Sequence, residues 1–410
     1  MDTTPIPVLI VDDDVTTAAL LRELLRNLGP DLECTTTCVT TGAAARAEFK
    51  RGEHRLVLLD YLLPDEDGLS LLAAVSVLPE DRRPVVIMLT GAGSEQVAVE
   101  AMKLGAKDYM VKTGVNPLAL RRAIIGALER HRLEERLAES TAQLRRHNAQ
   151  LEADLTMARE VQQALLPQQY PLFPPDAAPG ASRLNFCHRW LPSHQVAGDF
   201  FAVFPVSPGE AGVFQCDVMG HGVRAALITA LLRGLLREHQ ALAGDPGAFL
   251  GALNRQLQSM LARVGDLVFV TAVYLVVDTK TGVMKLANAG HPTPLHLERR
   301  ARRLTPWAMP DGAGPALGLM PEFVYDTVER TMAPGDAVLL FTDGIYEVED
   351  VTAEEFGQAR LRGAISTRLG EDTPRLLDGV LAEVQAWRPP GSLGLADDVC
   401  LVAVDRPPET

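Results

Sequence analysis

Three features of the sequence predict a multidomain protein that joins an α/β doubly wound domain, a helical coiled-coil linker and an α+β layered β-sandwich domain. Its 410 residues exceed what one hydrophobic core usually organises. Residues 6–125 alternate short apolar runs with helical patterns, and residues 117–166 contain no internal proline. From about residue 184 many strand-like runs accompany a few long helical stretches, which favours an α+β or layered arrangement.

The composition narrows the class of protein. Hydrophobic residues make up 47% and charged residues 22% of the chain, as in a globular protein. The net charge of −14 argues against a nucleic-acid partner, because phosphate contacts need a basic face. The five cysteines form no CxxC pair, which indicates reduced core residues. Neither a signal-peptide pattern nor a run long enough to cross a bilayer is found, so we expect a cytoplasmic protein without membrane contact.

The first predicted domain is a five-stranded parallel sheet. Its strands are expected at residues 6–11, 34–39, 55–60, 84–89 and 106–111. Helical patterns lie between these strands, and such alternation indicates a parallel sheet covered on both faces. In sheets of this kind, reactive groups collect at the carboxyl ends of the strands.

Five chemically active side chains stand at these strand ends. Asp12 and Asp13 end the first strand, Asp60 the third, Thr90 the fourth and Lys112 the fifth. Carboxylates suit Mg²⁺, which prefers oxygen ligands, and an aspartate can be the nucleophile that accepts a phosphoryl group. An amine beside them would neutralise charge on the phosphoryl oxygens. The set predicts an aspartyl-phosphate site that binds Mg²⁺.

Over roughly residues 5–128 the chain resembles the response-regulator receiver family. The segments VLIVDDD, LVLLDYLLPDEDG, VVIMLTG and GAKDYMVK occur in the family's order. The resemblance implies a sensor histidine kinase as partner and Asp60 as phosphoacceptor. The other implied roles are metal ligation by Asp12, Asp13, Asp60 and the Leu62 carbonyl, a switch hydroxyl on Thr90, a phosphate-pairing amine on Lys112 and a rotating ring on Tyr109. Thr113 stands where the family usually has proline, so the usual cis X-Pro bond is not expected.

A long helix is predicted to follow this domain and to pair with the same helix of a second subunit. Apolar side chains recur every seven residues, at Leu137, Leu144, Leu151, Ala158 and Leu165. If these are d positions of a coiled coil, the a positions are Thr141, Asn148, Leu155 and Gln162, and a polar central a residue favours a defined two-stranded pairing. The alternative is a single amphipathic helix packed on one domain.

In the C-terminal half, acidic residues stand at strand ends beside small residues. They are Asp199, Asp217, Asp343 and the pair Asp397–Asp398. Several carboxylates from distant segments are what a two-metal hydrolase needs, because two cations activate a bridging water and stabilise the phosphoryl oxygens. Carboxylate and water ligands suit Mg²⁺ or Mn²⁺ better than zinc.

This half resembles the PPM family of metal-dependent protein phosphatases, specifically the bacterial class that acts on anti-sigma-factor antagonists. The matching segments are AREVQQALLP, VAGDFF, DVMGHGVRAALI, FVTAVY, NAGHPTP, PALGL, DAVLLFTDGIYE and ADDVCLV, over about residues 155–405. The resemblance implies that Asp217 bridges two Mn²⁺ or Mg²⁺ ions and acts in catalysis, while the Val218 carbonyl binds one of them. It implies Asp343 and Asp397 on the other ion and Asp199 as a direct or water-mediated ligand; it leaves Asp398 undecided.

Several positions depart from the family pattern. Ala197 replaces a glycine, Ala202 an acidic residue and Cys400 a threonine, but no implied metal ligand is replaced. His221 and His291 are given no catalytic role; the simpler interpretation is that each hydrogen-bonds loop backbone.

Together the resemblances imply a two-component response regulator in which phosphorylation of Asp60 controls a protein-serine/threonine phosphatase. Its substrate would be a phosphorylated STAS-domain anti-sigma-factor antagonist. The expected divisions are a receiver domain at 1–125, a helical coiled-coil linker at 126–166 and a phosphatase domain at 167–410. One alternative is a catalytically silent phosphatase-fold module that binds and sequesters its partner; another is a mainly structural dimer.

Overall fold

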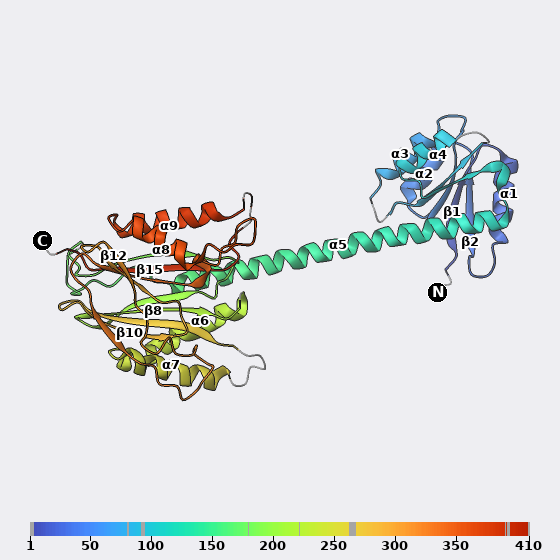
Figure 1. Ribbon diagram of the computed structural model, residues 1–410. Coiled ribbons are helices and arrows are strands. Elements are labelled where there is room, and N and C mark those ends of the chain that lie inside the picture. Colours follow the sequence, from blue (N-terminus) through green and yellow to red (C-terminus); the bar gives the residue numbers. More distant parts are fainter. Residues whose placement is uncertain are drawn as a thin grey trace. The chain divides into compact units, whose positions relative to one another are not determined.

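The chain forms two compact units joined through one helix. The computed structural model describes residues 4–79, 82–91, 95–178, 180–220, 222–261, 268–389, 391 and 394–408. The units are Met1–Asn148 and Ala149–Thr410, and helix α5 (Pro117–Leu165) runs through the boundary between them (Figure 1). The expected boundary between residues 125 and 126 falls inside α5, so the three-part division stays a prediction.

The first unit has the predicted parallel sheet of five strands, in the order β2-β1-β3-β4-β5. Its strands are β1 (Ile6–Val11), β2 (Cys34–Val39), β3 (Leu56–Asp60), β4 (Val85–Thr90) and β5 (Asp108–Val111). Its other elements are α1 (Val15–Arg26), α2 (Gly42–Arg51), α3 (Gly68–Ser76), α4 (Glu95–Lys103), the turn η2 (Lys112–Gly114) and the first part of α5. The α/β doubly wound fold class is confirmed.

The central strands of this sheet are apolar on both faces because helices cover both. In β1, Val8 and Ile10 belong to one core cluster, whereas Leu9 and Val11 belong to the cluster on the opposite face. All four side chains are fully buried. Alternate side chains of a strand point to opposite faces, so a continuous apolar run is what a doubly covered sheet requires.

The second unit contains two five-stranded sheets, in the orders β13-β10-β9-β8-β7 and β12-β11-β14-β15-β6. The strands are β6 (Asn185–Leu191), β7 (Phe200–Ser207), β8 (Glu210–Val218), β9 (Val270–Asp278), β10 (Val283–Ala289), β11 (Leu295–Glu298), β12 (Arg303–Pro306), β13 (Val328–Thr331), β14 (Ala337–Phe341) and β15 (Val399–Asp405). The helices and turns are α6 (Val223–Glu238), η3 (Gln240–Leu242), α7 (Pro246–Leu261), η4 (Asp343–Ile345), α8 (Gly357–Thr367) and α9 (Thr373–Trp387).

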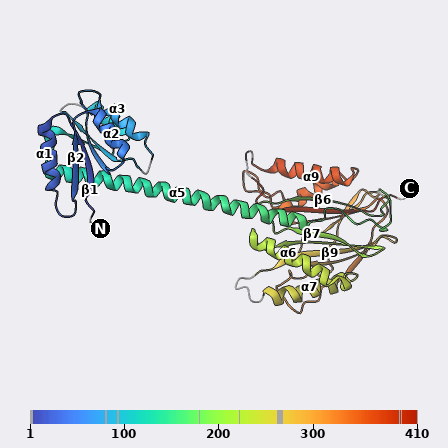
Figure 2. The same ribbon diagram turned by 180° about the vertical axis from the view of Figure 1, so that it is seen from behind.

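These elements stack as helices, sheet, sheet and helices. Helices α6 and α7 cover the outer face of one sheet, and α8 and α9 cover that of the other (Figures 1 and 2). The pattern of β14 explains the layers: Val338 and Leu340 face the cluster between the sheets, whereas Leu339 and Phe341 face α8 and α9. The predicted α+β layered sandwich is confirmed.

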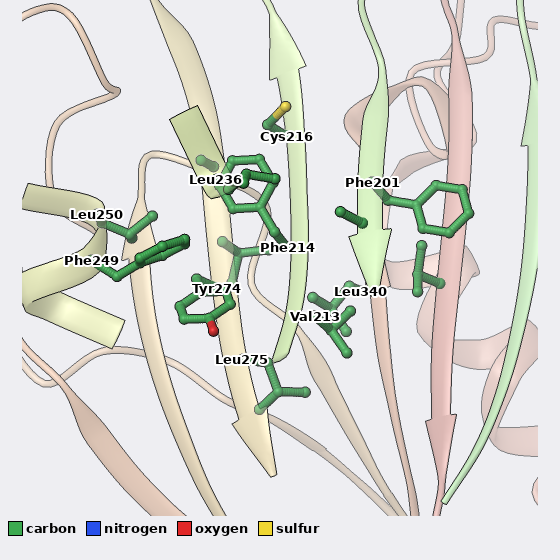
Figure 3. Close-up of a cluster of buried hydrophobic side chains, with 14 of the residues drawn as sticks. Phe201, Val213, Phe214, Cys216, Leu236, Phe249, Leu250, Tyr274, Leu275 and Leu340 are labelled. Atoms are coloured by element: carbon green, nitrogen blue, oxygen red, sulfur yellow. The ribbon is translucent and has the colours of Figure 1, made fainter. Parts of the chain in front are cut away.

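Aromatic side chains fill the layer between α7 and its sheet. The rings of Phe249 on α7 and Tyr274 on β9 have centroids 4.5 Å apart, and both residues are fully buried (Figure 3). The Tyr274 hydroxyl donates a hydrogen bond to the Ala243 carbonyl at 2.9 Å. This bond satisfies the one polar atom of a large buried side chain.

The residues of the predicted a/d pattern of α5 are exposed in the middle of the helix and packed on the second unit at its end. Leu137, Leu144 and Leu151 are 69%, 61% and 48% exposed, as expected for a stripe that lacks a partner helix within this chain. Gln162 is only 3% exposed and bonds its own domain, so its prediction as an a-position residue of a helix pair is wrong. The seven-residue spacing continues to Leu165, but this last part of the helix packs on the second unit.

Some elements did not stand out in the sequence, among them β7, β11, β12, β13 and α8. Strands β11, β12 and β13 have four residues each and offer few alternations, and α8 buries only Leu361, Ala364 and Ile365. None of the helices in the described residues is both long and apolar enough to traverse a bilayer.

Candidate functional site

The first unit gathers three carboxylates at the ends of neighbouring strands. Asp12 and Asp13 follow β1, and Asp60 ends β3, which pairs with β1. Among the described residues, this is the one group of three acidic, histidine or cysteine side chains whose ligand atoms all lie within 4.8 Å of one another. Asp14 caps α1 by accepting from the Thr16 amide at 2.9 Å, which turns the chain sharply after the pair. Such an oxygen set fits a hard divalent cation.

Lys112 supplies the positive charge of this site. Its Nζ lies 2.7 Å from Asp12 Oδ2 and 2.8 Å from Asp60 Oδ2. Burial raises the pKa of Asp60 and the Lys112 ammonium opposes that shift. Burial tends to lower the pKa of Lys112, but its hydrogen bonds to Asp12 and Asp60 prevail and raise this pKa. The amine is therefore charged at neutral pH and can pair with an incoming phosphoryl group.

The remaining expected receiver residues lie around the same strand ends. Thr90 ends β4 and is 1% exposed, with Oγ1 3.5 Å from the Met110 carbonyl. Leu62 and Tyr109 are 68% and 46% exposed. A Cβ at Gly68 would stand 2.4 Å from the Asp60 carbonyl oxygen, so only glycine lets the loop return this close to the phosphoacceptor position.

The second unit brings its acidic residues from both sheets to one edge. Asp199 precedes β7 and Asp217 lies near the end of β8, in one sheet. Asp343 follows β14 and Asp397 precedes β15, in the other. Thr342 joins the two sets, because its hydroxyl donates to Asp199 Oδ2 at 2.6 Å and accepts from the Cys400 amide at 2.9 Å.

Gly198 lies in close contact with oxygen atoms beside Asp217. A Cβ at this position would lie 2.8 Å from the Val218 carbonyl oxygen and 3.2 Å from both Asp217 Oδ1 and the Gly220 carbonyl oxygen. A side chain here would collide with these atoms, so glycine is what lets the loop approach Asp217 this closely. The three oxygens gathered around Gly198 are donors of the kind that fit Mg²⁺ or Mn²⁺.

A small cavity, with a volume of about 260 Å³, adjoins Asp217 and Gly220. Its lining comprises Asp217, Gly220, Gly344, Glu347, Val348, Ala396 and Asp397. These acids form no trio within 4.8 Å in the described part of the chain, unlike the receiver set. Wider spacing suits two cations about 3.5–4 Å apart, because each acid then serves one of them or bridges both.

Asp398 has a different environment from Asp397. Its Oδ1 accepts from the Ser193 amide at 2.7 Å and the Ser193 hydroxyl at 2.9 Å, and its Oδ2 accepts from the Gly198 amide at 2.6 Å. The residue is 4% exposed. Its carboxylate is therefore already occupied in holding Gly198 and the loop after β6.

Burial of like charges perturbs the acids of this edge. Burial, and then repulsion from Asp343 and Asp397, raise the pKa of Asp217 to about 7. Burial and the neighbouring Asp217 raise the pKa of Asp199 well above its ordinary value. Burial and Asp397 also raise the pKa of Asp343. A cluster that resists ionisation by itself would be stabilised by bound cations.

The departures from the family pattern leave this edge intact. Ala197, Ala202 and Cys400 are all buried in the core. Burial also raises the pKa of the Cys400 and Cys216 thiols well above the ordinary value, so both stay protonated. Among the two histidines, His221 lies outside the described residues. The His291 ring does not bond loop backbone as expected: its Nδ1 lies 3.0 Å from the Thr271 hydroxyl, and the Asn288 side chain bonds the His291 backbone instead.

Four residues at this site were not predicted from the sequence: Ser193, Thr342, Glu347 and Gln162. Thr342 and Glu347 flank Asp343 in a quoted motif, and Glu347 lines the cavity one turn further on. Ser193 gave no signal, since its contact with Asp398 spans about two hundred residues. The Gln162 side chain donates to the Ala197 carbonyl at 2.7 Å and accepts from the Ala197 amide at 2.9 Å.

Known families match both halves of the chain. Residues 8–125 match the response regulator receiver domain, and residues 207–407 match Stage II sporulation protein E (SpoIIE). The chain therefore combines an N-terminal receiver domain with a C-terminal phosphatase domain of the SpoIIE, or PP2C, type.

Individual relatives agree with this assignment. Protein IcfG of Synechocystis sp. is 26% identical over 279 residues, which cover 62% of this chain and 41% of that protein. Phosphoserine phosphatase RsbP of Bacillus subtilis is 23% identical over 214 residues, 52% of this chain and 50% of RsbP. The chain thus spans half or less of these relatives. The SiaA-PP2C domain of Pseudomonas aeruginosa, at 22% identity and a TM-score of 0.52, covers 63% of this chain and 97% of that domain, and it supports the fold.

The raised pKa of Asp217 predicts how pH affects the metal-free protein. The unfolded carboxyl has a pKa near 3.8 and the folded one about 7, so between these values the folded state binds the extra proton. The free energy of unfolding should therefore fall as pH rises from about 4 to 7. In Asp217→Asn this dependence should be weaker, and with chelator at pH 8 the variant should melt at a higher temperature than wild type. Thermal unfolding from pH 5 to 8 measures this pH dependence for wild type, Asp217→Asn and, as the control, a variant of an exposed acid, Asp311→Asn. Equal pH slopes for the three proteins would contradict the raised pKa of Asp217.

Proposed function

We propose that this chain is a two-component response regulator in which phosphorylation of Asp60 controls a metal-dependent protein-serine/threonine phosphatase. The proposed substrate is a phosphorylated STAS-domain anti-sigma-factor antagonist, and the proposed phosphodonor is a sensor histidine kinase. The observation that carries the proposal is the gathering of Asp217 Oδ1 and the Val218 and Gly220 carbonyls around Gly198, beside the cavity that Asp217 and Asp397 line. Similarity to the phosphoserine phosphatase RsbP supports the type of substrate.

In the phosphatase domain we propose that Asp217 bridges two Mn²⁺ or Mg²⁺ ions and that the Val218 carbonyl holds one of them. Asp343 and Asp397 would hold the other, with Asp199 bound directly or through water. Bound cations of this kind lower the pKa of a water and offset charge on phosphoryl oxygens. Thr342 already occupies Asp199 Oδ2, so only Oδ1 of that residue is free for a cation or its water. We assign Asp398 to holding Gly198 rather than to metal binding.

In the receiver domain we propose that an Asp60 carboxylate oxygen attacks the phosphoryl group and that the bond to the donor then breaks. Asp12, Asp13, Asp60 and the Leu62 carbonyl would hold Mg²⁺. The Lys112 ammonium lies beside both Asp12 and Asp60, so it could form an ion pair with the oxygens of a phosphoryl group on Asp60. Thr90, at the next strand end, would then bond the phosphoryl group through its hydroxyl.

We propose that α5 carries the effect of phosphorylation to the phosphatase domain. Gln162 supports this route, because its amide holds the Ala197 peptide through two hydrogen bonds and also reaches the Thr229 hydroxyl on α6 at 3.3 Å. Ala197 adjoins Gly198, which lies against the Val218 and Gly220 carbonyls and Asp217 Oδ1. A small change in the helix at Gln162 would therefore move the segment that borders the metal site.

We further propose that two subunits pair through the exposed leucines of α5. Leu137, Leu144 and Leu151 form a stripe with Asn148 between the last two, and Asn148 is also exposed. Burial of such leucines against a second helix stabilises the pair, at about 1.5–3 kcal/mol for each side chain. The polar residue Asn148 at an a position weakens the pairing of the two helices. A weak pair can be formed or broken by a free-energy change of a few kcal/mol, as a switch requires.

The test of the activity is release of phosphate from a serine-phosphorylated STAS-domain protein with Mn²⁺ present. Wild type should turn over, and Asp217→Asn should lose at least about 100-fold in rate, because even partners of metal ligands contribute roughly 10- to 100-fold. Acetyl phosphate should change the wild-type rate but not that of Asp60→Ala. A wild-type chain that binds the phosphoprotein without releasing phosphate would favour the silent binding module.

The contact of Gln162 gives a second test. Gln162→Leu leaves the Ala197 amide and carbonyl without partners, which costs about 1–3 kcal/mol for each buried group. We expect the ratio of activities with and without acetyl phosphate to fall toward one. Gln163→Leu is the matched control, because Gln163 is exposed and should keep the wild-type ratio. If Gln162→Leu responds like wild type, the signal does not pass through this contact.

The proposed pairing predicts a gain of dimer on removal of a polar a residue. Asn148→Leu should shift the monomer–dimer equilibrium toward dimer and make phosphatase activity less dependent on Asp60 phosphorylation. Light scattering on wild type and Asn148→Leu, each with and without acetyl phosphate, measures the mass. Monomers under all four conditions would rule out pairing through α5.

A further inference from the structure

The loop after β10 places an imidazole in the interior of the C-terminal domain. Asn288 Oδ1 accepts from the His291 amide at 2.8 Å, and Asn288 Nδ2 donates to the His291 carbonyl at 2.9 Å. The two bonds close the loop and fix the backbone of His291. Its side chain is directed inward, and the residue is 3% exposed.

The ring of His291 has one close polar contact. Nδ1 lies 3.0 Å from the Thr271 hydroxyl oxygen. Nε2 is buried and has no hydrogen-bond partner among the described residues. The Phe341 carbonyl lies near enough to favour a proton on the ring, although it does not meet hydrogen-bond geometry, and burial outweighs it and lowers the pKa of His291 to about 3. The ring is therefore neutral, with one nitrogen as donor and the other as acceptor.

Each neighbour of the ring lies close to an acid of the metal site, either across the sheet or along the chain. Thr271 on β9 stands directly opposite Asp217 on β8 in the strand register. Directly paired side chains share a face of the sheet, and their Cβ atoms lie about 4.5–5.5 Å apart. Phe341 ends β14, two residues before Asp343. His291 thus contacts one residue that stands opposite Asp217 in the sheet and lies near another that is two residues before Asp343.

The position of the ring hydrogen decides what the Thr271 hydroxyl can do. If Nδ1 carried the hydrogen, it would donate to Thr271, and the Thr271 hydroxyl would turn to another acceptor. The carboxylate opposite it is that of Asp217. If Nε2 carries the hydrogen, Nδ1 accepts from Thr271. The second arrangement pairs the ring acceptor with the Thr271 donor, and the nearby Phe341 carbonyl, itself an acceptor, favours a hydrogen on the ring nitrogen that Thr271 does not bond.

We infer that His291 is a positioning residue of the metal site. Protonated at Nε2, it accepts the hydrogen bond of the Thr271 hydroxyl and so keeps that hydroxyl away from the Asp217 carboxylate. Both Asp217 oxygens then stay available to cations. The inference rests on the proposed function only in taking Asp217 as a metal ligand.

Calorimetric titration of Mn²⁺ into the full-length chain tests this role. All proteins carry Asp13→Asn, so that the receiver site does not contribute. His291→Phe keeps the ring volume but removes the acceptor, and it should weaken Mn²⁺ binding about tenfold, the lower end of losses for partners of metal ligands. Thr271→Val removes the hydroxyl and should bind Mn²⁺ as the parent does. In the double variant, the loss caused by His291→Phe should disappear, and His291→Asn, whose amide oxygen can replace Nδ1, should recover part of it.

The double variant distinguishes positioning from general packing. An unchanged affinity in His291→Phe, or an equal loss with and without the Thr271 hydroxyl, would overturn the inference. His296→Phe is the matched control, since His296 is also buried at 5% exposure but lies beside Asp336. It should lower the melting temperature and leave Mn²⁺ affinity unchanged. A parent that binds Mn²⁺ but releases no phosphate contradicts the proposed function alone, and one that binds no Mn²⁺ contradicts both.

Discussion

The C-terminal domain depends on holding several carboxylates together although they repel one another. Asp217 and Asp199 come from one sheet and Asp343 and Asp397 from the other, so this repulsion acts across the junction of the two sheets. Neutral hydrogen bonds hold the junction instead: the Thr342 hydroxyl joins Asp199 to the amide of the opposite sheet. Each buried bond of this kind contributes only about 0.5–1.5 kcal/mol, which is why the edge remains responsive to cations.

In the receiver domain, a lysine side chain reduces the repulsion between the carboxylates. Lys112 Nζ lies within 2.8 Å of both Asp12 and Asp60, so the carboxylates are partly neutralised by the chain itself. Opposite charges at hydrogen-bond distance favour the ionised form of each group. The two domains of one chain therefore differ in how their acids are balanced: the receiver acids have a lysine of the same chain beside them, whereas burial and mutual repulsion raise the pKa of the C-terminal acids Asp199, Asp217 and Asp343.

The sequence predicted those features that depend on local pattern. Strand-end aspartates such as Asp60 and Asp217 stood out because an acid directly after a buried apolar run has no local explanation. The role of Asp398 did not stand out, because Ser193 and Gly198, the partners that occupy its carboxylate, are remote in sequence. Gln162 was assigned wrongly, since a seven-residue spacing records which side chains share a helix face but not which surface that face meets. Strands β11–β13 are too short for their alternation to be recognised.

The two buried thiols beside the acidic edge bear on which metals this domain selects. Cys216 and Cys400 are neighbours of Asp217 and Asp398 in the chain, and burial keeps both thiols protonated. The thiolate, not the thiol, is the form that coordinates soft ions. The two cysteines next to these acids therefore stay neutral and buried in the metal-free fold, and leave carboxylate and carbonyl oxygens to line the cavity. Copper(I) and zinc favour thiolate ligands, so burial of both thiols removes one means by which such ions would compete with magnesium or manganese at this edge.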